Sequence, residues 1–480
     1  MAPTPLRDFL EIPYDTLEEM NLQAQNQRRN RVPADQIREE RMKYLSDEKR
    51  IKAVTVCFTD LEGRFHMLDY DKKFLMRSGD NLTFDGSSVR GFTVQSESDL
   101  RLVIDWTSFY WMPSDIFGTG KVLVFGMVEN QDRSPYPGDM RARLRAYTEK
   151  LYRDKGLIAN AAHEIEGFLF KGVEAEQHYH ETGRFEFIST GGYYHSLPGD
   201  ALRQFIDTSA EAQRAMGFMN EKDHPEVAPS QFEMNFSFQE ANMAADQVQI
   251  YKLLTRQVAA QMGLTACYLP KPMAGVNGNG MHTNISLSNK DKNLFYDQAG
   301  KEGLSPLGWD FVQRVMASAQ ELCLVFNPSV NAYRRLDPHF EAPNQIKVSP
   351  TDRGSMIRIP LGNAKSARLE VRSVSPDTNP YLNLYAILRT GLEGPLGEPE
   401  EPGAKRPRTR FLPDNIQDAI RFFKGSKFLM EALGEDVHAK YAEVKVNQAE
   451  RCPKALGGLI KTAEIQFHHE VTNQYLWNQF

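Results

Sequence analysis

The sequence predicts an α+β fold divided into two domains, and three observations support this prediction. The chain has 480 residues, which is too long for one ordinary compact core. Hydrophobic residues make up 41% of the chain and charged residues 25%, a balance typical of globular proteins. Strand-like alternation dominates residues 51–128, and beyond residue 139 helical segments alternate with strands that carry polar residues at every second position.

The N-terminal segment is predicted to be helical. A helix is expected over residues 16–30, because Thr16 and Glu19 fit a capping box and Pro33 follows the last helical residue. Asp35 is expected to cap a second helix. These two helices would precede the first strand.

Strands are predicted next along the chain. The run IKAVTVCFTDLEGRFHMLDYD, which begins at Ile51, alternates polar and apolar residues on both sides of a turn at residues 61–63. This pattern predicts a hairpin. KVLVFGMV, which begins at Lys121, is predicted to be a buried strand. The segment DRSPYPGD is a plausible domain boundary because proline and glycine interrupt regular structure.

The rest of the chain mixes helices and strands. Helices are expected over residues 140–155 and 243–262, and the tail at residues 456–480 has a helical pattern. The only low-complexity stretch, GLEGPLGEPEEPGAKRPR, is predicted to be a loop before the last helices.

Charge and cysteine content exclude several classes of protein. The net charge of −6 argues against a nucleic-acid partner, which requires a dominant basic face. The N-terminus has no apolar stretch long enough for a signal peptide or a membrane span, so we expect a cytoplasmic protein that does not enter a membrane. Cys57, Cys267, Cys323 and Cys452 form no CxxC pair and are expected to be buried, reduced thiols.

Four strand-like segments place polar residues on one face and apolar neighbours on the other, as the two-residue period of a strand requires. The segments are HEIEGFLF, EVAPSQFEMNFSF, GNGMHTNISL and ARLEVRS, and the second alternates most cleanly. The acids, amides, imidazole and arginines that these segments contribute are Glu164, Glu166, Glu226, Gln231, Glu233, Asn235, His282, Asn284, Ser286, Arg368, Glu370 and Arg372.

Two interpretations of these segments stay open from the residues alone. Each segment could be the water-facing side of an amphipathic sheet. Alternatively, glutamates without lysine partners would repel one another unless a cation neutralised them, and five glutamates with one imidazole suit Mg²⁺ or Mn²⁺. Neighbouring arginines would then bind phosphate, as in metal-assisted phosphoryl transfer. VNGNGMH lacks the Lys-Ser/Thr ending of a P-loop, so the common nucleotide-binding folds are not indicated.

Eight motifs, in this order, resemble the glutamine synthetase family of bacterial and archaeal type (type I). They are NLTFDGSSVRGF, EIEGFLF, EVAPSQFE, KPMAGVNGNGMH, NPSVNAYRRLDPHFEAP, DRGSMIRIP, ARLEVR and NPYLNLYAILRTGLEG. The resemblance implies a β-grasp domain at residues 35–135, after an extension at residues 1–34. A catalytic domain at residues 136–480 would follow, with a curved antiparallel sheet flanked by helices. It also implies a homo-oligomer, a dodecamer of two hexameric rings with active sites between neighbouring subunits.

The resemblance implies two or more Mg²⁺ or Mn²⁺ ions in each active site, with ATP as co-substrate. One metal would be held by Glu166, Glu226 and Glu233, and a second by Glu164, His282 and Glu370. L-glutamate would contact Asn277, Gly278, Arg335 and Arg372. ATP would contact Glu221, Phe238, Ser286, Arg353, Arg358, Lys365 and Arg368. The ammonium site would comprise Asp85, Ser88, Tyr193 and Glu341, with Asp85 supplied by the adjacent subunit.

The implied reaction is ATP-dependent synthesis of L-glutamine from L-glutamate and ammonium. ATP would phosphorylate the side-chain carboxylate, and deprotonated ammonia would then attack the acyl phosphate. Arg353 and Arg372 would act in the first step, with the metals. Asp85 and Glu341 would act in the second, because carboxylates attract ammonium and one of them can accept a proton.

Three departures from the family pattern concern the nucleotide and metal regions. The family usually has HxH where this chain has His282-Thr-Asn284, His-His-Glu where it has His224-Pro225-Glu226, and a serine at Asn279. No predicted metal ligand is lost. The three departures together leave the amine open, so a relative that joins glutamate to a larger amine, such as a polyamine or ethanolamine, stays an alternative. A non-catalytic ring homologue is a further alternative. The complete sets of acids and arginines weigh against the latter, because unpaired acids without a function would only reduce stability.

Overall fold

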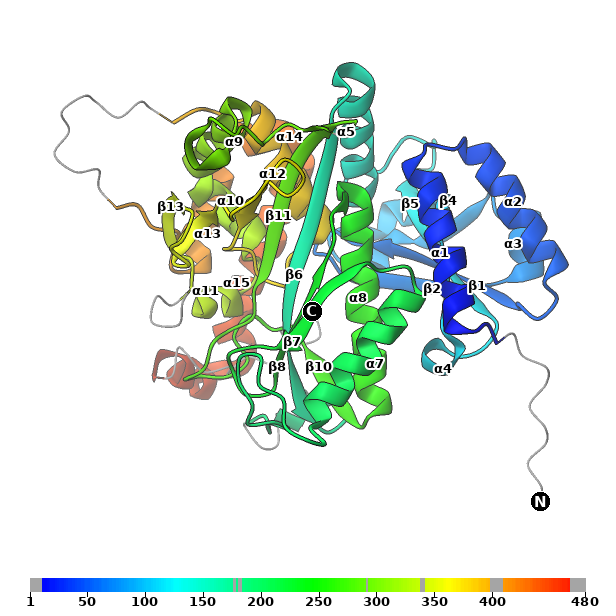
Figure 1. The fold of residues 1–480 in the computed structure, drawn as a ribbon, viewed down its shortest axis with the longest axis horizontal. Helices are drawn as coiled ribbons and strands as arrows, with labels where there is room; N and C mark the ends of the chain where they lie inside the picture. The colour runs from blue at the N-terminus through cyan, green and yellow to red at the C-terminus, as the bar shows by residue number, and fades with distance from the viewer. Residues whose placement is uncertain are drawn as a thin grey trace.

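The computed structural model describes residues 11–175, 178–179, 184–290, 292–336, 342–397 and 409–466, with side chains up to residue 450. These residues form two sheets, each with its own helices (Figure 1). The smaller sheet comes from the N-terminal part of the chain and the larger sheet from the rest. The α+β fold expected from the sequence is confirmed.

The first sheet has five strands in the order β2-β1-β5-β4-β3. β1 pairs with β5 in parallel, and the other neighbours are antiparallel. The strands are β1 Ala53–Thr59, β2 Phe65–Asp71, β3 Leu82–Asp85, β4 Asp99–Trp111 and β5 Lys121–Glu129. The predicted hairpin is confirmed as β1 and β2, and KVLVFGMV forms most of the buried strand β5.

The first helix, α1 (Tyr14–Arg29), begins before the predicted position. Its N-cap is Pro13, and no side chain caps it. The predicted capping box is wrong, because Thr16 and Glu19 both lie inside the helix and Pro13 already sets the backbone for the first turn.

The next helices lie on the same domain. α2 (Ala34–Asp47) has Pro33 as its N-cap, so Asp35 lies within the first turn and does not cap the helix as predicted. A carboxylate in the first turn still interacts favourably with the positive end of the helix dipole. The short helices α3 (Lys72–Ser78) and α4 (Ser114–Phe117) follow.

The second sheet has ten strands, and its main path is β13-β14-β15-β11-β6-β8-β7. β9 and β10 pair with β6, β12 pairs with β11, and among the described strands of this sheet only the β13–β14 pairing is parallel. The strands are β6 Ile158–Lys171, β7 Asn220–Pro225, β8 Gln231–Phe236, β9 Gln239–Glu240, β10 Leu264–Cys267, β11 Met281–Asn289, β12 Lys292–Asn293, β13 Gln345–Ser349, β14 Ser355–Arg358 and β15 Leu369–Val371.

The four segments with alternating polar residues are consecutive in this sheet, in the order β15-β11-β6-β8. Their apolar residues, such as Ile165, Met234, Ile285 and Leu369, are at most 1% exposed and form the core. Because side chains alternate between the faces of a strand, the polar residues of all four strands meet on the opposite face.

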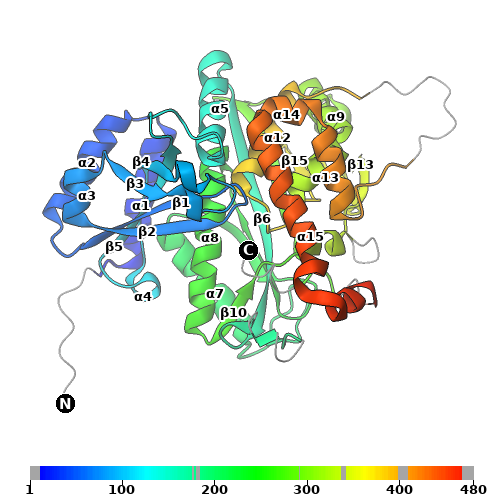
Figure 2. The ribbon, with the colours of Figure 1, turned by 180° about the vertical axis from the view of Figure 1, so that it is seen from behind.

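Helices pack against this sheet and against one another. They are α5 Met140–Lys155, α7 Ala201–Ala215, α8 Ala241–Gln261, α9 Pro306–Ala317, α10 Ala319–Phe326, α11 Val330–Arg335, α12 Pro380–Glu393, α13 Ile416–Gly425, α14 Lys427–Leu433 and α15 Glu435–Gln466. The prediction for residues 140–155 is confirmed with the same bounds, and α8 begins two residues before the predicted position. α15 is prominent in the view from behind (Figure 2).

Other predictions are confirmed only where the chain is described. Cys57, Cys267 and Cys323 are buried and form no disulfide bond within the described residues, whereas the side chain of Cys452 lies outside them. Residues 398–408 of the predicted loop and residues 467–480 of the predicted helical tail also lie outside them. No helix in the described part of the chain is both long enough and apolar enough to cross a membrane.

Candidate active site

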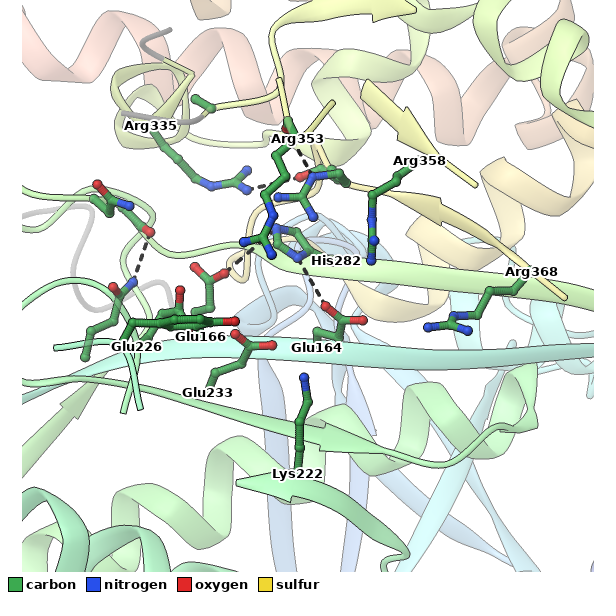
Figure 3. Close-up of a pocket in the computed structure, with 16 residues that line it drawn as sticks. Glu164, Glu166, Lys222, Glu226, Glu233, His282, Arg335, Arg353, Arg358 and Arg368 are labelled. Atoms are coloured by element: carbon green, nitrogen blue, oxygen red, sulfur yellow. Dashed lines mark hydrogen bonds and ion pairs between the residues drawn. The ribbon is translucent and has the colours of Figure 1, made fainter. Parts of the chain in front are cut away.

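A cavity lies over the polar face of the second sheet, with glutamates on the strands and arginines opposite them (Figure 3). The pairing of the strands brings the acids together. His282 on β11 is opposite Glu164 on β6, and Glu166 on β6 is opposite Glu233 on β8. Five of the six predicted metal ligands line this cavity, and the sixth, Glu370, lies beside it on β15.

One possible metal-binding group consists of Glu164, His282 and Glu370, with all candidate ligand atoms within 4.8 Å of one another. His282 Nδ1 lies 3.4 Å from Glu164 Oε2 and 3.6 Å from Glu370 Oε1. Burial opposes ionisation of Glu164, but its hydrogen bonds to His282 and Asn284 outweigh burial and lower the pKa of Glu164 to about 2. This group is the one that the family resemblance implies for the second metal.

A second possible group consists of His224, Glu226 and Glu233, again within 4.8 Å. Burial and the charges of Glu166 and Glu233 raise the pKa of Glu226 to about 10. Burial and the charges of Glu166 and Glu164 also raise the pKa of Glu233. These carboxylates therefore repel one another strongly at neutral pH unless protons or a cation compensate them.

Glu166 lies between the two groups. Its Oε2 accepts a hydrogen bond from the backbone N–H of Gly280 at 2.6 Å, and its Oε1 is 3.8 Å from His282 Nε2. Its charge raises the pKa values of both Glu226 and Glu233, so the three acids predicted to hold one metal share one electrostatic environment. The structure adds His224 to their surroundings.

Glu370 connects the acids to the arginines. It is fully buried, and its two carboxylate oxygens form ion pairs with Arg358, at 2.5 Å, and with Arg372. Arg372 Nε also donates to the backbone carbonyl of Arg353 at 3.2 Å. The positions of these arginines over the cavity therefore depend on one buried carboxylate.

The remaining predicted ligands of glutamate lie on the same side of the cavity. Asn277, Gly278 and Arg335 line it, and Arg335 Nη2 donates to the carbonyl of Arg372 at 3.1 Å. Burial lowers the pKa of Arg335 to about 10, so this guanidinium stays charged at neutral pH. A side chain at Gly278 would approach the carbonyl oxygen of Pro270 to 2.4 Å, which explains the glycine at this position.

Asn284, where the family resemblance implies a histidine, has hydrogen bonds on both sides. Its Nδ2 donates to Glu164 Oε1 at 3.0 Å, and its Oδ1 accepts from Arg368 Nε at 3.0 Å. The amide therefore links a predicted phosphate-binding arginine to a predicted metal ligand. An imidazole at this position could make a similar link only in one tautomer.

The cavity includes some of the predicted ATP and ammonium residues but not all of them. Arg353, Arg358, Arg368 and Tyr193 line it. Residues predicted to contact ATP that do not line it are Glu221, Phe238, Ser286 and Lys365. Of these, Ser286 is buried, whereas Glu221 and Lys365 are exposed.

Two other predicted ammonium residues, Asp85 and Ser88, do not line this cavity. Asp85 is exposed on the first domain, where it accepts hydrogen bonds from Ser87 and Ser88, and these bonds lower its pKa. Glu341 lies outside the described residues.

Lys222, His224 and Gln231 also line or border the cavity, although the sequence did not assign them a role in catalysis or binding. Gln231 Nε2 donates to the carbonyl of Gly278 at 3.0 Å and to Asn279 Oδ1 at 2.9 Å, so it fixes the glycine-rich loop. Lys222 pairs with β8 at Asn235, and this register could not be inferred from the sequence of β7 alone.

Comparisons with known proteins match both parts of the chain to known domain families. Residues 50–128 match the glutamine synthetase β-grasp domain, and residues 137–457 match the glutamine synthetase catalytic domain. A glutamine synthetase of Thermotoga maritima is 33% identical over 441 residues, which cover 89% of this chain and 98% of the relative. One of Methanosarcina mazei is 36% identical over 415 residues, covering 82% and 90% of the two chains.

Solved structures give a similar result. A structure of a GmaS/ADP complex has a TM-score of 0.74 at 26% identity, and the match covers 88% of this chain and 99% of that one. A structure of the same protein without ligand has a TM-score of 0.75, also at 26% identity, and covers 88% and 98% of the two chains.

Proposed function

The chain belongs to the glutamine synthetase family and is a ligase, and we propose that it joins ammonium to the γ-carboxylate of L-glutamate at the expense of ATP. The products are L-glutamine, ADP and phosphate, and γ-glutamyl phosphate is the intermediate. The observation that carries this proposal is a single cavity with two acidic groups facing five arginines. A non-catalytic ring homologue is no longer a candidate.

The acids of the cavity fit divalent cations. Glu226 Oε2 and His224 Nε2 are buried without a hydrogen-bond partner, and the raised pKa values of Glu226 and Glu233 reflect uncompensated negative charge. Oxygen donors with few nitrogen donors suit Mg²⁺ or Mn²⁺. Two or more such ions, held by the six predicted ligands, would neutralise the acids and the phosphates of ATP.

The residues that bind glutamate and ATP then position the two substrates for phosphoryl transfer. Arg335, Asn277 and Gly278 hold glutamate, so that its γ-carboxylate oxygen faces the γ-phosphorus of ATP. That oxygen forms a bond to phosphorus as the bond to the β–γ bridging oxygen breaks, and ADP leaves. Arg353, Arg358 and Arg368 stabilise the charge on the transferring phosphoryl group.

The amine step needs a group that attracts ammonium and accepts a proton. We assign these roles to Asp85 of a neighbouring subunit and to Glu341, with Ser88 and Tyr193 beside them. Ammonia attacks the acyl carbon, phosphate leaves, and the lost proton passes to a carboxylate. This assignment requires a ring in which the exposed Asp85 of one chain reaches the cavity of the next, and we propose the dodecamer and a cytoplasmic location on the same basis.

A larger amine is the second candidate, and one observation favours it. The rings of Tyr193 and Tyr194 lie 3.8 Å apart and are 40% and 55% exposed. Tyr193 lines the cavity. Such an aromatic surface could contact the carbon chain of an alkylamine or polyamine.

The deciding experiment is a phosphate-release assay with ATP, Mg²⁺, glutamate and a panel of amines. We expect ammonium to give the highest kcat/KM, above methylamine, ethanolamine and polyamines. A preference for a larger amine would overturn the proposed substrate but leave the phosphoryl-transfer residues in place. Absence of glutamate-dependent phosphate release with every amine would contradict both candidates.

Asp85→Asn and Glu341→Gln test the two steps separately. Each change removes a negative charge at nearly constant shape, so amide formation should fall sharply while a slow glutamate-dependent ATP hydrolysis persists. Equal loss of both activities would refute the assignment of these residues to the amine step. Unchanged use of ammonium would refute it as well.

A further inference from the structure

The loop that carries Asp85 is held by α15. This loop, residues 85–93, follows β3 and is called the Asp85 loop below. Its turn buries Phe92, while Asp85 itself stays exposed. The contacts that fix the loop come from a helix more than 340 residues later in the chain, as the separation of 348 residues between Phe92 and its hydrogen-bond partner Lys440 shows.

The strongest of these contacts is a buried charge cluster around Glu62, a residue of the turn between β1 and β2. Lys445 Nζ lies 3.0 Å from Glu62 Oε1, and both side chains are 3% exposed. Arg90, in the Asp85 loop, places its Nε 3.3 Å from Glu62 Oε2. Gln448 also donates to Glu62. One carboxylate therefore joins the Asp85 loop to α15.

A second contact fixes the far end of the loop. Lys440 Nζ donates to the carbonyl of Phe92 at 2.5 Å and to the hydroxyl of Tyr136 at 3.3 Å. The ring of Phe92 packs against Tyr136 with centroids 5.0 Å apart. Between the two lysines, Val444 lies 3.6 Å from the position that a side chain on Gly91 would occupy. One face of α15 therefore lies along the Asp85 loop.

The turn that carries Glu62 is itself fixed to the catalytic domain. Gly63 has φ +101°, and a side chain there would approach Asn379 Cα to 2.7 Å. Asn379, the N-cap of α12, donates to the carbonyls of Asp60 and Leu61. Glu62 therefore cannot move away from α15 without separating the two domains.

The charges around Glu62 hold the Asp85 loop in one specific position. Burial opposes ionisation of Glu62, but Lys445 and Arg90 outweigh it and lower the pKa of this carboxyl. Removing Lys445 leaves the buried Glu62 carboxylate with less compensating charge, because its other ion-pair partner, Arg90, is 26% exposed, and a buried carboxylate that loses a partner is destabilised. The loop would then shift to bring Arg90 or Glu62 toward water, and Asp85 would shift with it.

We propose that Glu62, Lys445 and Lys440 are positioning residues for the amine step, because they set where the Asp85 loop presents its carboxylate to the neighbouring subunit. This inference rests on the proposed function of Asp85. The inference also gives α15 a role in the amine step at the adjacent active site. No described side chain of α15 lines the cavity of its own chain.

Lys445→Met tests the proposal, with Lys427→Met on α14 as the matched control, since Lys427 is exposed. We expect the KM for ammonium to rise about tenfold or more, because small displacements of a reacting group are costly. Glutamate-dependent phosphate release without ammonium and the KM for ATP should stay within about twofold of wild type, as positioning of the phosphoryl-transfer groups is unchanged. Lys445→Arg, which keeps the charge, should restore most of the ammonium affinity.

Lys440→Met keeps the test decisive if Lys445→Met does not fold, because it removes only hydrogen bonds to Phe92 and Tyr136. Folded variants with an unchanged KM for ammonium would overturn the proposal, and so would an equal loss of both steps. Asp85→Asn, measured beside them, separates this outcome from failure of the proposed function. If Asp85→Asn also leaves amine use unchanged, the role of Asp85 is wrong. If only the lysine variants leave the KM for ammonium unchanged, the positioning role alone is wrong.

Discussion

Glu370 is the residue at which the acidic and basic halves of the cavity meet. Its carboxylate is fully buried, holds Arg358 and Arg372, and lies 3.6 Å from His282 Nδ1. It is therefore a predicted metal ligand that also positions two predicted substrate-binding residues. A buried carboxylate with these partners cannot be replaced by a neutral group without leaving two guanidinium groups unpaired.

We expect Glu370→Ala to reduce glutamate-dependent phosphate release and amide formation together, by at least about 100-fold. Both steps fail because the residue acts before the intermediate forms. Phosphate release at saturating Mg²⁺ measures the effect, and Glu431→Ala, at an exposed position on α14, is the control. Near-normal turnover would exclude Glu370 from the metal site.

The clustered carboxylates also predict a pH dependence of metal binding. In the metal-free protein the pKa of Glu226 is about 10, above its value of roughly 4.3 in an unfolded chain. Protonation thus stabilises the folded metal-free protein at low pH, and this contribution is lost as the pH rises toward 10. A cation replaces the proton, so metal affinity should rise with pH.

The expected result is that the difference in Tm between Mg²⁺-loaded and EDTA-treated protein increases from about pH 6 to about pH 9. Thermal unfolding of both forms across this range provides the measurement. Glu226→Gln should flatten the increase, because it removes the group that titrates. A Tm difference that stays constant or shrinks with pH would contradict the proposed ligand set.

At the scale of elements, α1 acts as a connection between the domains. Asn21 is fully buried and bonds through its amide to the backbone of Trp111 on β4 and to the carbonyl of Ala215 on α7. Arg28, in the last turn of the helix, pairs with Asp246 on α8 at 2.9 Å. The helix thus contacts both domains through buried polar groups, and sequence patterns do not reveal such contacts.

Asn21→Ala should destabilise the protein by about 2–4 kcal/mol, because it leaves several buried backbone groups without partners. The midpoint of thermal unfolding measures this loss, and Glu19→Ala, at an exposed position on the same helix, is the control. Activity at low temperature should persist, since Asn21 does not line the cavity. A midpoint equal to that of wild type would show that α1 does not stabilise the domain contact.

At the scale of the whole molecule, the apolar residues of the C-terminal segment predict that this segment contacts another subunit. Tyr475, Leu476, Trp477 and Phe480 are close together in the sequence, although they lie outside the described residues. Large apolar residues near a terminus are costly in water and favour contact with another chain. In the proposed dodecamer this segment would join one ring to the other.

Deletion of residues 471–480 should therefore separate the rings or destabilise them, and light scattering would report the lower mass. Serine at all four apolar positions should have the same effect in a chain of full length, which distinguishes loss of apolar contact from loss of length. An unchanged dodecamer in both variants would refute the prediction.

The sequence by itself determined the fold class, and its resemblance to a family predicted the residues of the site. The two-residue period of β6, β8, β11 and β15 predicted their buried and polar faces, because alternation is a local property of the backbone. The hairpin and the helix at residues 140–155 followed from equally local signals. The same patterns placed the acids and arginines on one face of each strand but left open whether that face meets water or a cation, and the family resemblance supplied the functional interpretation.

Tertiary structure decided what depends on pairing between distant segments. The order β15-β11-β6-β8 placed Glu370, His282, Glu164 and Glu233 around one cavity, and no segment encodes its neighbour in the sheet. The helix caps were wrong because Pro13 and Pro33 set the backbone before each first turn, so no side-chain cap was required. The contacts of α15 that hold the Asp85 loop could not be predicted from the sequence, for the same reason as the cavity. Lys445 and Glu62 lie 383 residues apart in the chain, and only packing brings their charges together.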